Sequence, residues 1–176
     1  MVRNPNSLER HALLREKVWA NVDDVTSLTD ACSGADAVIS TLGSAPKGPT
    51  TVCTDGIRSA VTAMKQARLS RLIAVSAHGV AETHDRSLYS LAVWASVSDR
   101  MRDKETMELL IRDSDLAWTI VRPPALKNQP ATGTYRVGAN IPIRLFSSIS
   151  RADLAAFLIL EAEQPRFVHG FPRIVR

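Results

Sequence analysis

Small and polar residues follow three apolar segments of the chain, where a parallel sheet would gather them. The segment "VISTL" leads into Gly43 and Ser44, "RLIAV" into Ser76 and His78, and "LAWTIV" into Arg122 and the two prolines after it. Ligands of open parallel sheets bind just beyond the carboxyl ends of the strands. These positions are therefore the first candidates for binding residues.

Other kinds of site lack a matching pattern in the sequence. No residues form a Ser/His/Asp triad, a metal-ligand set or a carboxylate pair at a telling spacing. Cys32 and Cys53 are far apart, and we expect both to be reduced packing residues. The net charge of +4 comes from scattered arginines, which gives no reason to expect a nucleic-acid partner. With no long apolar run and no apolar N-terminal segment, we expect a cytoplasmic protein without a membrane partner.

The elements that would position these residues alternate between strands and helices. Apolar runs predict strands at residues 18–22, 36–42, 70–77 and 116–124, with a short strand in the last seven residues. Amphipathic patterns predict helices at residues 23–34, 50–69, 98–114 and 150–165, the last capped by Ser150. Residues 78–96 read as less regular. The alternation predicts an α/β fold with a parallel sheet, and 176 residues suit a single domain.

Several segments resemble a known family, in the order in which that family carries them. They are "VRNP" (2–5), "GADAVISTLG" (34–43), "RLIAVSAHG" (71–79), "DKETMELLIRDSDLAWTIVRPPAL" (103–126) and "SISRADLAAFLI" (148–159). The chain resembles the atypical, NmrA-like short-chain dehydrogenase/reductases, and most of all the biliverdin-IXβ reductase/flavin reductase group. The resemblance implies a Rossmann-like doubly wound parallel sheet. The family's first strand, GxxGxxG turn and first helix would precede residue 1, so we expect an N-terminally truncated domain.

The resemblance also implies where a cofactor would bind, with NADP expected and NAD possible. Arg3 would meet the 2′-phosphate of NADP, or is an ordinary surface arginine. Asn21 and Val22 would lie near the adenine, although Asn21 also suits a turn. Leu42, Gly43 and Ser44 would pass close to the cofactor, with a plain turn glycine as the alternative for Gly43. The backbone of Pro124, Ala125 and Leu126 would bind a carboxamide.

The implied catalytic residues are Ser76 and Lys104, and the sequence departs from the family pattern around both. Ala77 stands where relatives often have a second serine, and Arg100 stands where the usual mechanism places a tyrosine. Lys104 would hold the nicotinamide ribose, or instead form a solvated ion pair with Glu108. His78 is either a proton donor near neutral pH or a solvated loop residue.

Together these expectations describe an NAD(P)H-dependent oxidoreductase. The acceptor would be a flavin-, quinone- or tetrapyrrole-like small molecule, because such acceptors need mainly binding and orientation from the protein. The alternatives are a non-catalytic NADP-sensing regulator and an inactive truncated member of the family. The oligomeric state stays open, although an unpaired sheet edge can recruit a second chain.

Overall fold

The computed structural model describes residues 1, 12, 13, 15–19, 21–43 and 48–176. Arg3 and Ser44, two of the predicted cofactor residues, lie outside the described residues. The elements in chain order are α1 (Val25–Cys32), β1 (Val38–Ser40), α2 (Val52–Gln66), β2 (Arg71–Val75), η1 (Ala81–Thr83), α3 (Leu88–Arg112), β3 (Ala117–Val121), β4 (Ala125–Lys127), β5 (Arg136–Gly138), β6 (Ser148–Ser150), α4 (Arg151–Glu163) and β7 (Arg173–Val175).

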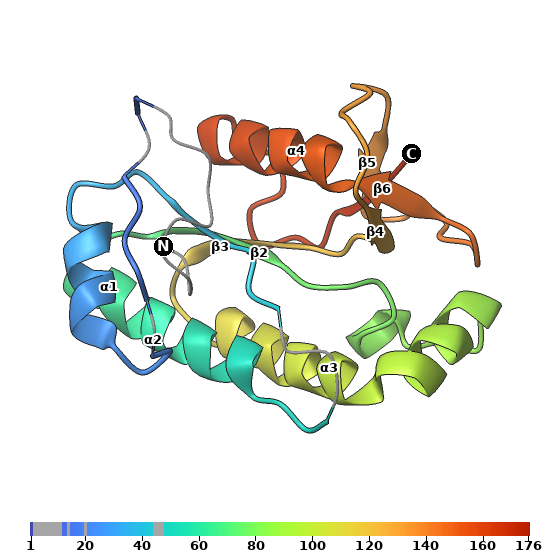
Figure 1. Cartoon of the computed structure of the whole chain (residues 1–176), viewed down its shortest axis with the longest axis horizontal. Coiled ribbons are helices and arrows are strands. Elements are labelled where there is room, and N and C mark those ends of the chain that lie inside the picture. Colours follow the sequence, from blue (N-terminus) through green and yellow to red (C-terminus); the bar gives the residue numbers. More distant parts are fainter. Residues whose placement is uncertain (2–11, 14, 20, 44–47) are drawn as a thin grey trace.

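Three parallel strands form the central sheet, in the order β1-β2-β3. In the register of the sheet, Val38 of β1 pairs with Leu72 of β2, and Leu72 pairs with Trp118 of β3. Helices α1, α2 and α3 cover one face of this sheet, and α4 covers the other (Figure 1). The doubly wound α/β fold expected from the sequence is thereby confirmed.

The core lies on both faces of the sheet because successive side chains of a strand point to opposite sides. Leu72, Ala74 and Ile120 pack in one cluster with α2 and α3 residues such as Met64 and Ile111. The intervening Ile73, Val75 and Val121 pack in a second cluster, with Phe157 and Leu158 of α4. Strand β2 is buried along its whole length, as its continuous apolar run predicts.

The predicted strand at residues 18–22 is wrong for the described part of that segment. Val18 makes only an isolated bridge, and the chain turns at Val22 and Asp23. The Asn21 side chain accepts a hydrogen bond from the Asp23 backbone at 3.1 Å, and Asp24 accepts one from Ser27 as the N-cap of α1. Short polar side chains that bond to their own backbone favour turns over strands, which explains the difference.

The segment predicted as irregular, residues 78–96, is largely ordered. It contains η1 and the first part of α3, which begins after the N-cap Ser87. Val97 has non-helical dihedrals (φ −143, ψ 37), so α3 is two helical stretches joined at a kink. We call residues 88–96 the α3 arm. The expected helix at 98–114 is the second stretch.

The remaining strands form two small sheets at one end of the molecule (Figure 1). Strand β4 pairs with β6 in parallel, and β5 pairs with β7 antiparallel. Ser150 caps α4 by accepting a hydrogen bond from the Asp153 backbone at 2.9 Å, as predicted. Both cysteines are buried free thiols, also as predicted. No helix in the described part of the chain combines the length and apolar character of a membrane span.

A buried ion pair fastens α4 to the sheet. Arg71 of β2 donates to the Glu161 carboxylate at 2.9 Å, and the Thr119 hydroxyl donates to the same oxygen at 3.1 Å. Glu161 is fully buried, and its carboxylate also accepts from the backbone N–H groups of Arg166 and Phe167. Removing one partner of a buried pair leaves the other charge without compensation.

We expect Glu161→Ala to lower the free energy of unfolding by about 3–5 kcal/mol, because it leaves Arg71 charged and unpaired in the core. The matched control is Glu163→Ala, two residues along the same helix and exposed, which should change stability by no more than about 0.5 kcal/mol. Urea unfolding followed by circular dichroism measures both. Equal effects of the two substitutions would contradict a special role for the pair.

Candidate functional site

Lys104 joins the ends of two neighbouring strands of the central sheet. Its ammonium group donates to the backbone carbonyl of Val75, the last residue of β2, at 2.9 Å, and to that of Leu42, just after β1, at 3.4 Å. Glu108 is not its partner, because the Glu108 carboxylate binds Arg122 at 2.5 and 3.0 Å. The solvated Lys104–Glu108 pair considered from the sequence is therefore wrong. The third ammonium donor has no hydrogen-bond partner among the described residues and is available to a ligand.

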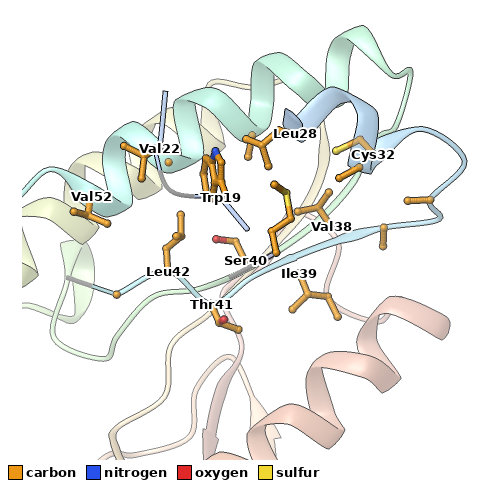
Figure 2. Close-up of a pocket in the computed structure, with 17 residues that line it drawn as sticks. Trp19, Val22, Leu28, Cys32, Val38, Ile39, Ser40, Thr41, Leu42 and Val52 are labelled. Atoms are coloured by element: carbon orange, nitrogen blue, oxygen red, sulfur yellow. The ribbon is translucent and has the colours of Figure 1, made fainter. Parts of the chain in front are cut away.

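A cavity of about 490 Å³ lies along β1. Figure 2 shows its wall, with Leu28 and Cys32 from α1, Val52 from α2 and the strand residues Val38, Ile39 and Ser40. Three of the predicted cofactor residues, Val22, Leu42 and Gly43, line it. Its volume falls within the usual range of small-molecule sites.

Trp19 contributes a polar atom to the cavity wall. Its indole Nε1 is buried and has no hydrogen-bond partner among the described residues. Buried indole N–H groups normally find an acceptor. A ligand that offers an acceptor in the cavity would therefore satisfy this donor. Sequence reasoning missed Trp19, which it placed within a strand.

Asn21, in contrast, lies at the surface, and its side-chain carbonyl serves the turn before α1. This favours the turn interpretation that the sequence left open for it.

Ser76 follows β2 directly, next to Val75, whose carbonyl accepts from Lys104. Its backbone N–H bonds to the Val121 carbonyl at 2.8 Å, while its hydroxyl is buried without a partner among the described residues. Ser76 is 3% exposed. A buried hydroxyl that no protein group satisfies is a candidate hydrogen-bonding group for a bound molecule.

The loop after β3 lies beside the residues that follow β2. The Pro123 carbonyl accepts a hydrogen bond from the His78 backbone at 2.9 Å. Ala125 and Leu126 belong to β4, whose backbone pairs with β6 in the register Ala125–Ser148. One edge of the backbone predicted to bind a carboxamide is thus paired within the protein, and the opposite edge has no strand partner in the described part of the chain.

His78 is neither solvated nor a group that titrates near neutral pH, so both sequence interpretations of it are wrong. The residue is 4% exposed, and its Nδ1 has no hydrogen-bond partner within the described ranges. Burial, followed by the charge of Arg173, lowers the pKa of His78 to about 4. The imidazole is therefore neutral at pH 7, and it contacts the Tyr89 ring with centroids 5.4 Å apart.

The N-terminus of α2, which opens beside the cavity, already holds a carboxylate of the protein. The Asp103 oxygens accept from the backbone N–H groups of Cys53 and Thr54, both at 2.9 Å. The other three described α-helices also begin with a side-chain cap: Asp24, Ser87 and Ser150. A helix N-terminus binds phosphate through free N–H groups and a positive dipole, and a bound carboxylate occupies both.

The described residues therefore suit the adenosine and nicotinamide ends of a dinucleotide better than the pyrophosphate between them. The cavity with Trp19 offers an apolar slot and one donor, and Ser76 with Lys104 offers donors some distance along the strand ends. The described helix N-termini supply no comparable set of donors for a pyrophosphate. Sequence reasoning also missed Asp103, because its partners at Cys53 and Thr54 lie 50 and 49 residues away in the chain.

Arg122 fixes the position of the chain just after β3. It is 1% exposed and pairs with both Glu108 and Glu82, and its guanidinium lies 4.2 Å from the centre of the Phe171 ring. Its charge is therefore fully compensated within the protein. Arg122 acts as a support for the loop after β3 and is not free to bind a ligand.

The low pKa of His78 makes stability depend on pH in a defined window. Between about pH 6.5, the ordinary pKa of histidine, and pH 4, the unfolded chain binds a proton at this residue that the folded chain does not. We expect His78 to reduce the free energy of unfolding across this window, as the pH falls, by an amount on the order of 1–3 kcal/mol. Urea unfolding at intervals from pH 7 to 4 measures it. The same slope in His78→Gln would contradict this assignment.

Comparisons with known proteins find relatives of this chain. The chain is 32% identical over 158 residues to the "uncharacterized sugar epimerase YhfK" of Bacillus subtilis, an alignment that covers 85% of this chain and 67% of YhfK. It is 29% identical over 143 residues to the yeast UPF0659 protein YMR090W, of which it spans 60%.

A solved structure with a similar fold is the ChuY anaerobilin reductase of Escherichia coli O157:H7, with a TM-score of 0.73 and 24% identity. The alignment covers 88% of this chain and 72% of ChuY. At that identity the likeness shows the fold alone. A family model described as "NAD(P)H-binding" matches residues 1–165, nearly the whole chain. The chain therefore belongs to the NAD(P)H-binding family.

Proposed function

We propose that this chain is part of an NAD(P)H-dependent reductase that passes a hydride to a flavin-, quinone- or tetrapyrrole-like acceptor. The observation that carries the proposal is the buried hydroxyl of Ser76, which has no hydrogen-bond partner among the described residues and follows the strand end that Lys104 holds. It is an unsatisfied polar group at the carboxyl end of a central parallel strand, where such sheets bind ligands.

The cofactor would lie across the strand ends in two parts. Its adenosine half would enter the cavity lined by Val22, Leu42 and Gly43, and Trp19 would donate to it. Its nicotinamide half would reach Ser76 and the remaining donor of Lys104. Arg3 would meet the 2′-phosphate, which favours NADP. When bound, the reduced nicotinamide supplies the hydride, and the residues named here bind and orient it.

The acceptor class follows from what the site lacks. Arg100 stands four residues before Lys104, one helical turn away, so no tyrosine hydroxyl donates a proton from that position, and Ala77 offers no second hydroxyl beside Ser76. His78 is held neutral by burial and by its arginine neighbour. A conjugated acceptor that accepts a hydride by stacking on the nicotinamide needs few protein acids. The fold neighbour ChuY, an anaerobilin reductase, makes a tetrapyrrole a reasonable candidate.

A second candidate is a regulator that binds NADP without turning it over. The bonds from Lys104 to two backbone carbonyls favour it, because they give this lysine a structural task. The site would then sense the cofactor through the same cavity and release no product.

We expect NADPH to bind with a dissociation constant at least about tenfold below that of NADH, since Arg3 would add a charge-assisted contact to the 2′-phosphate. Titration followed by quenching of tryptophan fluorescence measures both constants. Val22→Trp should fill the cavity and weaken NADPH binding by about tenfold or more, while Val168→Trp, at an exposed position away from the cavity, should leave it unchanged.

Steady NADPH oxidation with flavin or biliverdin would support the reductase, and Ser76→Ala should then reduce kcat by about tenfold or more. If the chain binds NADPH but neither flavin nor biliverdin leads to its oxidation, the result would favour the sensor. Equal NADPH affinity in the two tryptophan variants would exclude the cavity as the cofactor site.

A further inference from the structure

Strand β7, which carries Arg173, lies beside the chain after β3, and that chain bonds to the loop that carries His78. Strand β7 bridges the chain after β3 at Arg173 and Arg122, and the Arg122 backbone donates to the Pro172 carbonyl at 2.9 Å. The His78 backbone donates to the adjacent Pro123. Tyr89 of the α3 arm contacts the His78 ring and packs with Val175 of β7.

Arg173 has no carboxylate partner among the described residues. It is partly buried, and its guanidinium donates to the Ile141 carbonyl at 3.1 Å. Its neighbour Arg122 has two carboxylate partners, Glu82 and Glu108. A partly buried guanidinium that bonds only to a carbonyl keeps most of its five donors for other acceptors.

The residues near His78 also include buried polar atoms that no described group satisfies. The Nδ1 of His78 and the hydroxyls of Ser76 and Ser90 are buried without partners in the part of the chain that the structure describes. Ser90 is the residue after Tyr89, so the α3 arm and the loop after β2 both contribute. Native proteins leave few buried polar atoms unpaired, and a bound group often explains those that are.

We propose that Arg173 and His78 form a binding site for an anionic group, a phosphate or a carboxylate, on the acceptor. The inference rests on the proposed function, because the acceptor is the molecule that would bring the anion. Arg173 would supply the charge and the His78 imidazole a further hydrogen bond. The acceptors concerned are therefore anionic members of the proposed class, such as flavin mononucleotide or a tetrapyrrole with propionate groups.

The position of this site separates it from the cavity along β1. The cavity lies along β1, whereas His78 follows β2 and Arg173 lies beside the end of β3. In the sheet order β1-β2-β3, the cavity is thus at the first strand, and the two residues of this site are at the ends of the second and third. A molecule that meets the nicotinamide at Ser76 can thus reach Arg173 from the opposite side.

The test uses two pairs of ligands that differ only in charge. Flavin mononucleotide and riboflavin share one ring system, and biliverdin and its dimethyl ester share another. We expect the wild-type chain to bind the anionic member of at least one pair roughly tenfold more tightly or better, as a charge-assisted hydrogen bond requires. Arg173→Gln should reduce this ratio to about two, whereas Arg173→Lys, which keeps the charge, should retain most of it.

Arg68→Gln is the matched control, because it removes the same charge from an exposed position at the opposite end of β2. The His78 ring signals in nuclear magnetic resonance give an independent measurement. The His78 ring contacts the Tyr89 ring, and the charged groups that shift the pKa of His78 are Arg173, Asp85 and Arg122. A bound anion should raise the pKa of His78 in the wild-type chain, and in Arg173→Gln only weakly.

Equal affinities within both pairs in the wild type would overturn the inference, as would an undiminished ratio in Arg173→Gln. Failure of all four ligands to bind would overturn it too. The proposed cofactor binding is judged separately, by the NADPH titration, which does not involve Arg173.

Discussion

The second stretch of α3 holds the functional edge of the sheet through three charged residues that lie within two helical turns. Asp103 bonds to the start of α2, Lys104 to the strand ends at Leu42 and Val75, and Glu108 to Arg122 after β3. Asp103 and Glu108 are buried, so their charges are tolerable only with these partners. The relative positions of α2 and all three strand ends therefore depend on one helix. These hydrogen bonds and ion pairs therefore determine the shape of the candidate site.

Much of the fold could be read from the sequence, because it depends on local patterns. Continuous apolar runs marked β2 and β3, and the Ser150 cap marked the start of α4. The segment 18–22 was predicted wrongly because its apolar residues outweighed the turn chemistry of Asn21 and Asp24. The α3 arm was missed because its exposed Leu88 and Leu91 obscure the helical pattern of its inner face.

The site was less predictable, since it depends on contacts between residues far apart in the chain. The sequence pointed to Ser76, Lys104 and the Leu42–Gly43 turn, and the structure places these along one edge. Nothing local in the sequence shows that Lys104 bonds to two carbonyls, that Asp103 occupies the start of α2, or that His78 is buried. Arg173 was not predicted as a site residue either, because its lack of a carboxylate partner among the described residues is seen only when β7 is placed beside β3.

The kink at Val97 divides α3 into parts with separate tasks. The second stretch fixes the strand ends by buried charges, while the arm rests on the loop after β2 through Tyr89 and through Trp94, whose indole donates to the Gly79 carbonyl at 2.7 Å. Under the proposed function, the arm borders the acceptor and the second stretch supports the cofactor. Substitutions in the arm can then change which acceptor fits without disturbing the contacts beneath the cofactor.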